Sequence, residues 1–372
     1  MTYMTKPCLV TRVLLPRSIF FVCLLCFAHQ SVTQTPPPVI SPLSPAEISE
    51  LQSKAQAGDA ASQRKLAKAY EHGNGVSQSD AQALKWFRAA ADQGDAAAQN
   101  DVGIMYRLGA GGNPELDRIE ALAWYQKAAK QENSEALFNL GTAYYNGDGV
   151  SVNDLSAYAW FLLAKNLGNP RAEEAVQRMK KEAGDLEPNA LEKIAEMYVQ
   201  GDGLPQNSSK AADWYRKAVD IGGASVKMKL ANLLLHDQNV AANYPEIRSL
   251  CEKAANQHFS AGAFCVGQLY EHGFGVPVSP TEAFTWYLRA ANQLNGRATL
   301  RVGEMYWNGE GVAQDKIAGY EFIYIASTSG LAEAKQEKEI VEKDLTPQEL
   351  KEAKEKAAKW NHSGLPVSVP KK

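Results

Sequence analysis

The chain has 372 residues, a formal net charge of −3 and 22% charged residues. Its length alone would suggest two or three globular domains. The weakly acidic balance, without long runs of either sign, excludes the basic field that attracts nucleic acid, so no nucleic acid partner is expected.

Residues 1–28 are predicted to be a secretory signal peptide. An apolar run over residues 19–28 follows three basic residues, which are Lys6, Arg12 and Arg17. This run is too short to cross a bilayer as a helix, and cleavage at its end would release an exported, periplasmic or secreted chain without a membrane span. The alternative is an uncleaved segment that anchors the chain to the membrane at its N-terminus.

Residues 29–45 are predicted to form a proline-rich linker. Five of the twelve residues from Gln34 to Pro45 are proline, which favours an extended, solvated backbone. The sequence Ser44-Pro45-Ala46-Glu47 has the form of a capping box, which marks the start of a helix.

A 36-residue repeat occupies most of the remaining chain. Seven times a large residue is followed, about sixteen residues later, by a second large residue and then by an alanine. The first position is held by Tyr70, Tyr106, Tyr144, Tyr198, Leu234, Tyr270 and Tyr306. The second position is held by Trp86, Trp124, Trp160, Trp214, Leu250, Trp286 and Phe322. A fixed period of this size predicts stacked units rather than one closed core.

Each repeat is predicted to form two antiparallel helices. In the sixth repeat, Gly262, Val266, Gly267 and Tyr270 share one face of the first helix, where small residues let a neighbouring helix approach closely. The second helix carries an apolar stripe that faces its hairpin partner and the next repeat. Two helices of this size need neighbours to bury these faces.

The helix ends carry recognisable signals. Glycines after most of the first helices suit a left-handed backbone, and in the fifth repeat Asp237 and Asn239 take their place and are predicted to adopt the same conformation. Asp80, Asp154 and Ser208 are predicted to cap the second helices of their repeats.

This signature, A-x-x-x-[LV]-[GA]-x-x-Y-x-x-G-x-G-V followed by A-x-x-W-[YF]-x-x-A, resembles the Sel1-like repeat, a relative of the tetratricopeptide repeat, over roughly residues 58–330. The resemblance implies an all-α, right-handed α-solenoid of about seven helical-hairpin repeats, used mainly as a protein-interaction scaffold. Secreted and envelope-located bacterial members are common in that family.

The spacing of the repeats predicts two arrays. Tyr144 and Tyr198 are 54 residues apart, one period plus eighteen, which indicates an inserted helix that either bends the superhelix or lies on its surface. Thr346 to Glu349 forms another capping box, which predicts a polar capping helix. The expected order is three repeats in 46–170, an insert or capping helix in 171–185, four repeats in 186–345, a capping helix in 346–363 and a disordered tail in 364–372.

Catalytic and metal sites are not expected. Ser62 and Lys65 match the S-x-x-K motif of serine β-lactamases, so a hydrolase of the β-lactam or peptidoglycan type is the alternative function. Ser62, however, falls at the small packing position of the repeat. His72, His236 and His272 share another repeat position, and adjacent repeats would hold them too far apart for one metal ion. No cofactor is expected.

Two cysteines lie beyond the predicted signal peptide. Cys251 and Cys265 fall on successive antiparallel helices, and export would permit a disulfide between them. In related secreted Sel1-like proteins the bonded cysteines would align with Ala255 and Ala263. Position 265 is otherwise polar, which predicts that Cys265 points away from the helix contact. Bonded and free cysteines both remain open.

First-helix positions that the repeat does not specify are the candidates for binding a partner. In related solenoids such helices line the concave face, and aromatic groups in a groove are usual binding hot spots. The candidates are Asn139, Thr142, Tyr145, Asn232, Leu235, Gln268, Arg301, Glu304 and Trp307. Of these, Tyr145, Leu235 and Trp307 either anchor a partner or fill gaps between repeats. The leading interpretation is an exported, non-catalytic scaffold that binds a protein or peptide in the bacterial cell envelope.

Overall fold

The computed structural model describes residues 42–238 and 242–360, which form α-helices and one short 3-10 helix without any strand. The predicted signal peptide, most of the predicted linker and the predicted tail lie outside these residues. None of the described helices is long and apolar enough to span a membrane. The chain divides into two compact units, residues 1–184 and 185–372.

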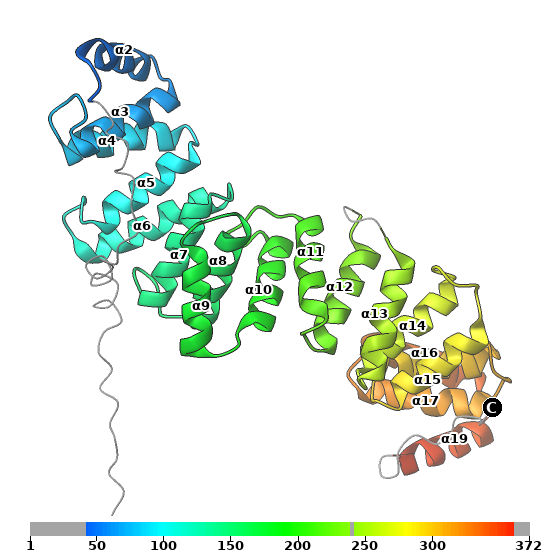
Figure 1. Cartoon of the computed structure of the whole chain (residues 1–372). Helices are drawn as coiled ribbons and strands as arrows, with labels where there is room; N and C mark the ends of the chain where they lie inside the picture. The colour runs from blue at the N-terminus through cyan, green and yellow to red at the C-terminus, as the bar shows by residue number, and fades with distance from the viewer. Residues whose placement is uncertain (1–41, 239–241, 361–372) are drawn as a thin grey trace, which may run out of the picture. The chain divides into compact units, whose positions relative to one another are not determined.

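The first unit contains a capping helix, three hairpins and a further helix (Figure 1). The capping helix is α2 (Pro45–Gln56). The hairpins pair α3 (Ala60–His72) with α4 (Asp80–Asp92), α5 (Ala96–Arg107) with α6 (Pro114–Ala129), and α7 (Ser134–Asn146) with α8 (Asp154–Asn166). Helix α9 (Ala172–Ala183) lies within the predicted insert and packs against α8.

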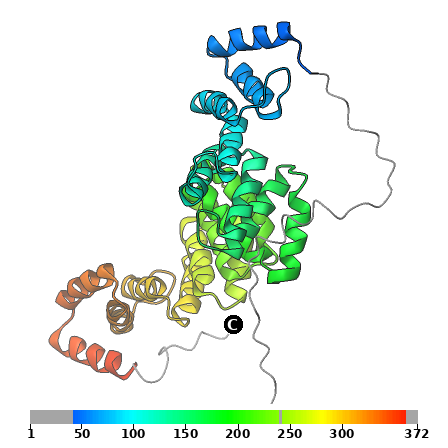
Figure 2. The same ribbon diagram turned by 90° about the vertical axis from the view of Figure 1, so that its left-hand side faces the viewer.

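The second unit contains four hairpins and three terminal elements (Figure 2). The hairpins pair α10 (Glu187–Gln200) with α11 (Ser208–Val219), α12 (Ala224–His236) with α13 (Tyr244–Asn256), α14 (Ser260–His272) with α15 (Pro280–Ala291), and α16 (Gly296–Asn308) with α17 (Lys316–Thr328). The terminal elements are α18 (Ala332–Val341), the 3-10 helix η1 (Glu342–Asp344) and α19 (Pro347–Trp360), which packs against α17. These hairpins confirm the predicted all-α repeat architecture. The earlier helix of each pair is called the first helix below.

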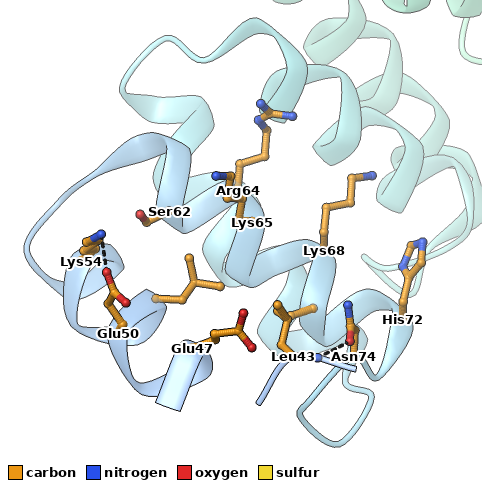
Figure 3. Close-up of a pocket in the computed structure, with 12 residues that line it drawn as sticks. Leu43, Glu47, Glu50, Lys54, Ser62, Arg64, Lys65, Lys68, His72 and Asn74 are labelled. Atoms are coloured by element: carbon orange, nitrogen blue, oxygen red, sulfur yellow. Dashed lines mark hydrogen bonds and ion pairs between the residues drawn. The ribbon is translucent and has the colours of Figure 1, made fainter. Parts of the chain in front are cut away.

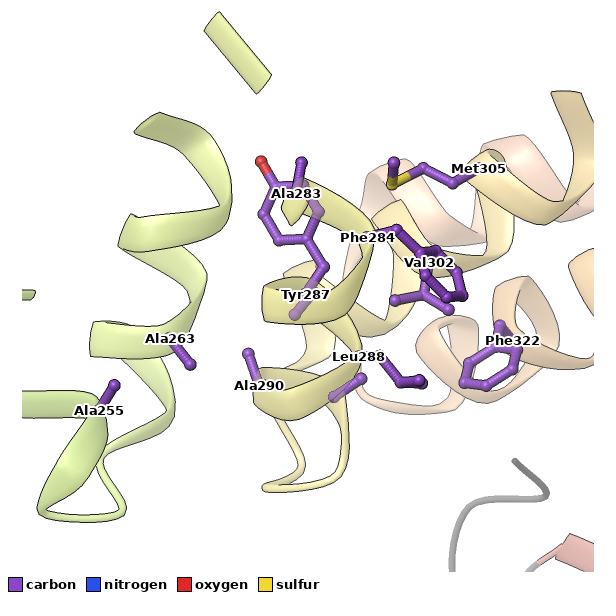
Figure 4. Close-up of a cluster of buried hydrophobic side chains, with 12 residues drawn as sticks. Ala255, Ala263, Ala283, Phe284, Tyr287, Leu288, Ala290, Val302, Met305 and Phe322 are labelled. Carbon is purple, nitrogen blue, oxygen red and sulfur yellow. The ribbon is translucent and has the colours of Figure 1, made fainter. Parts of the chain in front are cut away.

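The hairpins close around small residues, as the repeat pattern predicts. Gly267 on α14 is buried, and a Cβ atom added to it would lie 2.5 Å from the Tyr287 ring of α15, so only glycine lets the two helices approach this closely. Figure 4 shows Ala263 of α14 and Ala290 of α15 facing one another, with Phe322 of α17 in the same buried cluster. The two helices of a hairpin thus bury one side against each other, and the hairpin buries another side against the next hairpin.

The second helices begin one residue earlier than the predicted caps imply. Asn153 is the residue with extended backbone, and its side chain accepts a hydrogen bond from the Ser156 N–H at 2.8 Å. Asp154, the predicted cap, is already the first helical residue. The same correction applies to Asp80 and Ser208, where the capping side chains are Ser79 and Asn207. A cap must lie outside the helix for its oxygen to reach the third N–H group.

The fifth repeat ends its first helix differently from its neighbours. Gly273, which ends α14, has a left-handed backbone with φ of 73°, as predicted for the glycine loops. Asp237, at the end of α12, has an extended backbone with φ of −91°, so the predicted left-handed conformation is wrong there. Its carboxylate instead accepts a hydrogen bond from the Ser208 hydroxyl of α11. Asn239 lies outside the described residues.

Capping boxes begin the terminal helices as predicted. At α2 the Ser44 hydroxyl accepts from the Glu47 N–H, and the Glu47 carboxylate accepts in return from the Ser44 N–H at 2.8 Å. At α19 the same reciprocal pair joins Thr346 and Glu349. Both boxes satisfy N–H groups that would otherwise lack partners at a helix start.

Candidate functional site

The candidate partner-binding residues differ widely in exposure. Asn139 and Tyr145 on α7 are buried, whereas Asn232 on α12 is exposed. The remaining candidates are half-buried, and they are Thr142, Leu235, Gln268, Arg301, Glu304 and Trp307. The first helices therefore present only part of the predicted set to a partner.

Tyr145 and Asn139 are packing residues rather than surface anchors. Tyr145 is 8% exposed, and its hydroxyl donates a hydrogen bond of 2.6 Å to the Glu182 carboxylate on α9. The Asn139 amide donates to Asn100 of α5 at 2.8 Å. For Tyr145 the structure thus favours the alternative in which the side chain fills a gap between helices.

Polar first-helix residues pair with the equivalent helix of the preceding repeat. The Lys229 ammonium on α12 lies 2.6 Å from the Glu192 carboxylate on α10 and also contacts Glu196. On α16, Arg301 pairs in the same way with Glu271 of α14. Partial burial opposes the charge on Lys229, but the hydrogen bonds to the two glutamates outweigh it and raise the pKa of the ammonium group. These pairs link repeats along the first-helix face.

An open groove of about 730 Å³ lies on the first-helix side of the second unit, between α10 and α12. Its walls combine the apolar residues Val199 and Leu233 with polar and charged groups. Asn232 is the one predicted candidate that lines it. The other polar lining residues are Glu196, Gln200, Tyr215, Lys229, His236, Asp237 and Gln238.

A second groove, of about 520 Å³, lies between α2 and α3 in the first unit (Figure 3). Figure 3 shows Arg64, Lys68 and His72 in a row along α3. Arg64 lies 3.2 Å from the Asp95 carboxylate, and Lys68 lies 3.2 Å from that of Asp101. Acidic residues of α5 and its cap thus pair with Arg64 and Lys68 across the boundary between the first two repeats.

Ser62 lines this second groove but lacks the setting of a nucleophile. It is 6% exposed, at the small packing position that the repeat predicts. The Asp59 carboxylate accepts hydrogen bonds from both the hydroxyl and the N–H of Ser62, and these bonds lower the pKa of Asp59. The hydroxyl is thus part of the cap of α3. A serine nucleophile needs a neighbouring base that removes its proton, and the lowered pKa makes the Asp59 carboxylate a weaker base than an ordinary one.

The histidine positions give no metal centre in the part of the chain that the structure describes. His72, His236 and His272 are exposed on the last turns of three first helices. No three or more histidine, cysteine, aspartate or glutamate side chains among the described residues are grouped so as to hold a metal ion.

A disulfide joins Cys251 of α13 to Cys265 of α14, with 5.9 Å between the Cα atoms. Cys265 is 4% exposed, so the prediction that it points away from the helix contact is wrong. The equivalent residues Asp101 and Asn139 are also buried, because their polar groups bond to the preceding repeat. At these two positions polar character therefore reflects pairing between repeats rather than exposure.

A comparison with known protein families finds a match over most of the repeats. Six segments, which together make up more than half of the chain, match the sequence model of the family described as Sel1 repeat; they are residues 60–95, 96–133, 134–169, 188–222, 261–293 and 296–331. The α12–α13 hairpin, whose loop lacks the usual glycines, is not among them. No curated protein matches the chain.

Three of the solved structures that are similar to the chain are as follows. A protective antigen of uropathogenic Escherichia coli that displays an SLR fold is 24% identical, with a TM-score of 0.35 over 88% of this chain and 84% of that one. A Sel1 repeat protein from Oxalobacter formigenes is 26% identical, with a TM-score of 0.38 over 78% of each chain. Cysteine-rich protein B of Helicobacter pylori is 21% identical, with a TM-score of 0.30 over 35% of this chain and 92% of that one.

Proposed function

The chain belongs to the Sel1 repeat family, and from this premise we propose that it is an exported, non-catalytic scaffold that binds a protein or peptide in the bacterial cell envelope. The observation that carries the proposal is the open groove between α10 and α12, where Asn232 is exposed on a first helix. Stacked helical hairpins supply extended surfaces of this kind for binding other polypeptides.

Export is proposed from the amino-terminal sequence. The basic residues, the short apolar run of residues 19–28 and the proline-rich segment that follows have the order of a secretory signal and a linker. Fractionation of cells that express the full chain tests this step. Full-length chain confined to the cytosol would exclude an envelope scaffold.

Blocking the groove is expected to reduce partner binding. Because Asn232 is exposed, Asn232→Arg adds bulk to the groove with little effect on folding. In a pull-down from envelope extract, the variant is expected to recover at least about tenfold less of the partner than wild type, as for loss of a central contact. Quantitative mass spectrometry of the eluates measures the ratio.

The matched control for this pull-down is Gln257→Arg, which adds the same side chain at an exposed position after α13. It should recover as much partner as wild type. Equal recovery by Asn232→Arg and wild type would remove the groove from the proposal, and no specific partner in any eluate would contradict the scaffold function.

Hydrolase activity is expected to be absent. Since the Ser62 hydroxyl is engaged at the cap of α3, purified full-length chain should turn over nitrocefin no faster than a buffer control, and Ser62→Ala should not change that rate. Turnover that Ser62→Ala abolishes would instead establish the β-lactam type of hydrolase. Circular dichroism of both proteins checks that the comparison is between folded chains.

A further inference from the structure

Tyr215 has a buried ring and a hydroxyl without a hydrogen-bond partner among the described residues. The side chain is 4% exposed, and it lines the groove between α10 and α12. The charges of Glu196 and Lys229 act on its hydroxyl, which places this group on the charged side of the groove. The Tyr215 oxygen is not among the buried side-chain atoms that lack a partner in the described part of the chain, so the hydroxyl is accessible from the groove and can bond to a ligand there.

The sixth repeat shows what satisfies the equivalent hydroxyl elsewhere. Tyr287 of α15 occupies the position of Tyr215, and its hydroxyl donates a hydrogen bond to the Glu271 carboxylate of α14. The residue equivalent to Glu271 in the fourth repeat is Val199, which has no acceptor. The fourth repeat therefore lacks, at the groove, the internal acceptor that Tyr287 has in the sixth repeat.

The groove carries an excess of negative charge beside this hydroxyl. Lys229 pairs with both Glu192 and Glu196, so two carboxylates share one ammonium group. The Glu196 side chain remains 38% exposed and lines the groove. A second cation from a partner would balance the remaining carboxylate, whereas a further anion would be repelled.

The protonation state of the Tyr215 hydroxyl determines which groups it can bind. Burial, followed by the charge of Glu196, raises the pKa of Tyr215 to about 12. The phenol is therefore protonated at neutral pH and can donate to an acceptor such as a peptide carbonyl. Amide groups of Gln200 and Asn232 line the same groove and suit the donors and acceptors of an extended backbone.

We propose that the groove between α10 and α12 binds an extended peptide segment that carries a lysine or arginine side chain. The cation of that side chain pairs with Glu196, a neighbouring backbone carbonyl accepts from the Tyr215 hydroxyl, and Val199 and Leu233 contact the aliphatic part of the side chain. This assignment rests on the proposed scaffold function and names the chemistry of its partner.

The test uses the immobilised full chain and three pools of nonapeptides. The pools are randomised among uncharged residues except for a central lysine, norleucine or glutamate. Mass spectrometry measures how much of each pool is retained. Wild type is expected to retain lysine peptides about tenfold better than norleucine peptides, as for one partly desolvated ion pair, and glutamate peptides least.

Two groove variants separate the roles of charge and hydrogen bond. Glu196→Gln should bring the lysine-to-norleucine ratio close to one. Tyr215→Phe keeps the buried ring, and it should reduce retention of the lysine and norleucine pools alike, by about threefold to tenfold for one hydrogen bond. The control is Glu252→Gln, which removes a carboxylate paired with Arg248 on α13 and should behave as wild type. Thermal melts verify that every variant is folded.

Several outcomes would overturn the assignment. These are equal retention of the lysine and norleucine pools by wild type, preference for glutamate, a lysine preference that survives Glu196→Gln, or retention of no pool. If the envelope pull-down still recovers a partner in any of these cases, the scaffold function stands and only the cationic assignment is lost.

Discussion

Replacing Tyr287 with alanine is expected to lower the free energy of unfolding of the second unit by about 3–5 kcal/mol, the usual range for removing a large buried aromatic side chain. The ring is 1% exposed and lies against Gly267, whose lack of a side chain leaves nothing to fill the cavity. It also packs against Phe264, with 5.4 Å between ring centroids. Urea unfolding of the full chain, followed by circular dichroism, measures the loss.

One further substitution separates the hydroxyl of Tyr287 from its ring, and another serves as a surface control. Tyr287→Phe removes only the hydrogen bond to Glu271 and should destabilise by about 1–2 kcal/mol, because Arg301 still pairs with that carboxylate. Ile221→Ala alters a side chain that is 54% exposed and should change stability by less than about 0.5 kcal/mol. A Tyr287→Ala effect as small as that of Ile221→Ala would contradict the packing described for this repeat.

Breaking the bond between Cys251 and Cys265 is expected to destabilise the second unit by about 3 kcal/mol, the value that chain entropy predicts for a loop of this length. The two cysteines are 14 residues apart, and the bond joins α13 to α14. Dithiothreitol should therefore lower the urea midpoint of the oxidised chain. The first unit contains no cysteine among its described residues, so it should be unaffected.

The control for reduction is the double variant Cys251→Ala and Cys265→Ala, whose urea midpoint should not respond to dithiothreitol. Alanine is preferred to serine here because both sites are buried and a hydroxyl would lack a partner. Thiol labelling of chain isolated from the envelope gives an independent measurement. Two free thiols, or a wild-type midpoint that does not respond to reductant, would show that the bond does not form in the protein.

Local patterns predicted the repeats because the physical causes are local. The spacing of Gly262, Val266, Gly267 and Tyr270 places them on one helical face, and the helix that contains them follows from that spacing alone. The capping boxes at Ser44 and Thr346 likewise depend on residues within one turn. The sequence predicts the N-caps of the second helices one residue late, because two neighbouring polar residues compete for the cap and only one lies outside the helix.

Contacts between repeats were less predictable, since they join residues 30 or more positions apart. From the sequence, Tyr145 either anchors a partner or fills a gap between repeats, and the hydrogen bond from its hydroxyl to Glu182 of α9 favours the second. The sequence predicts that Cys265 faces outward because its equivalents are polar, yet Asp101 and Asn139 at that position are buried and bond to the preceding repeat. The partners of such residues depend on the spacing between stacked helices, which no single repeat contains.

The sequence by itself determined that this chain is a stack of helical hairpins, because the period, the small residues and the glycine loops act within one repeat. Only the tertiary structure decided where that stack has an open groove. In the groove between α10 and α12, Val199 offers no acceptor, the Tyr215 hydroxyl lies among charged side chains, and Glu196 shares the cation of Lys229 with Glu192. Those three facts depend on side chains from successive helices meeting in space, which the order of residues alone does not specify.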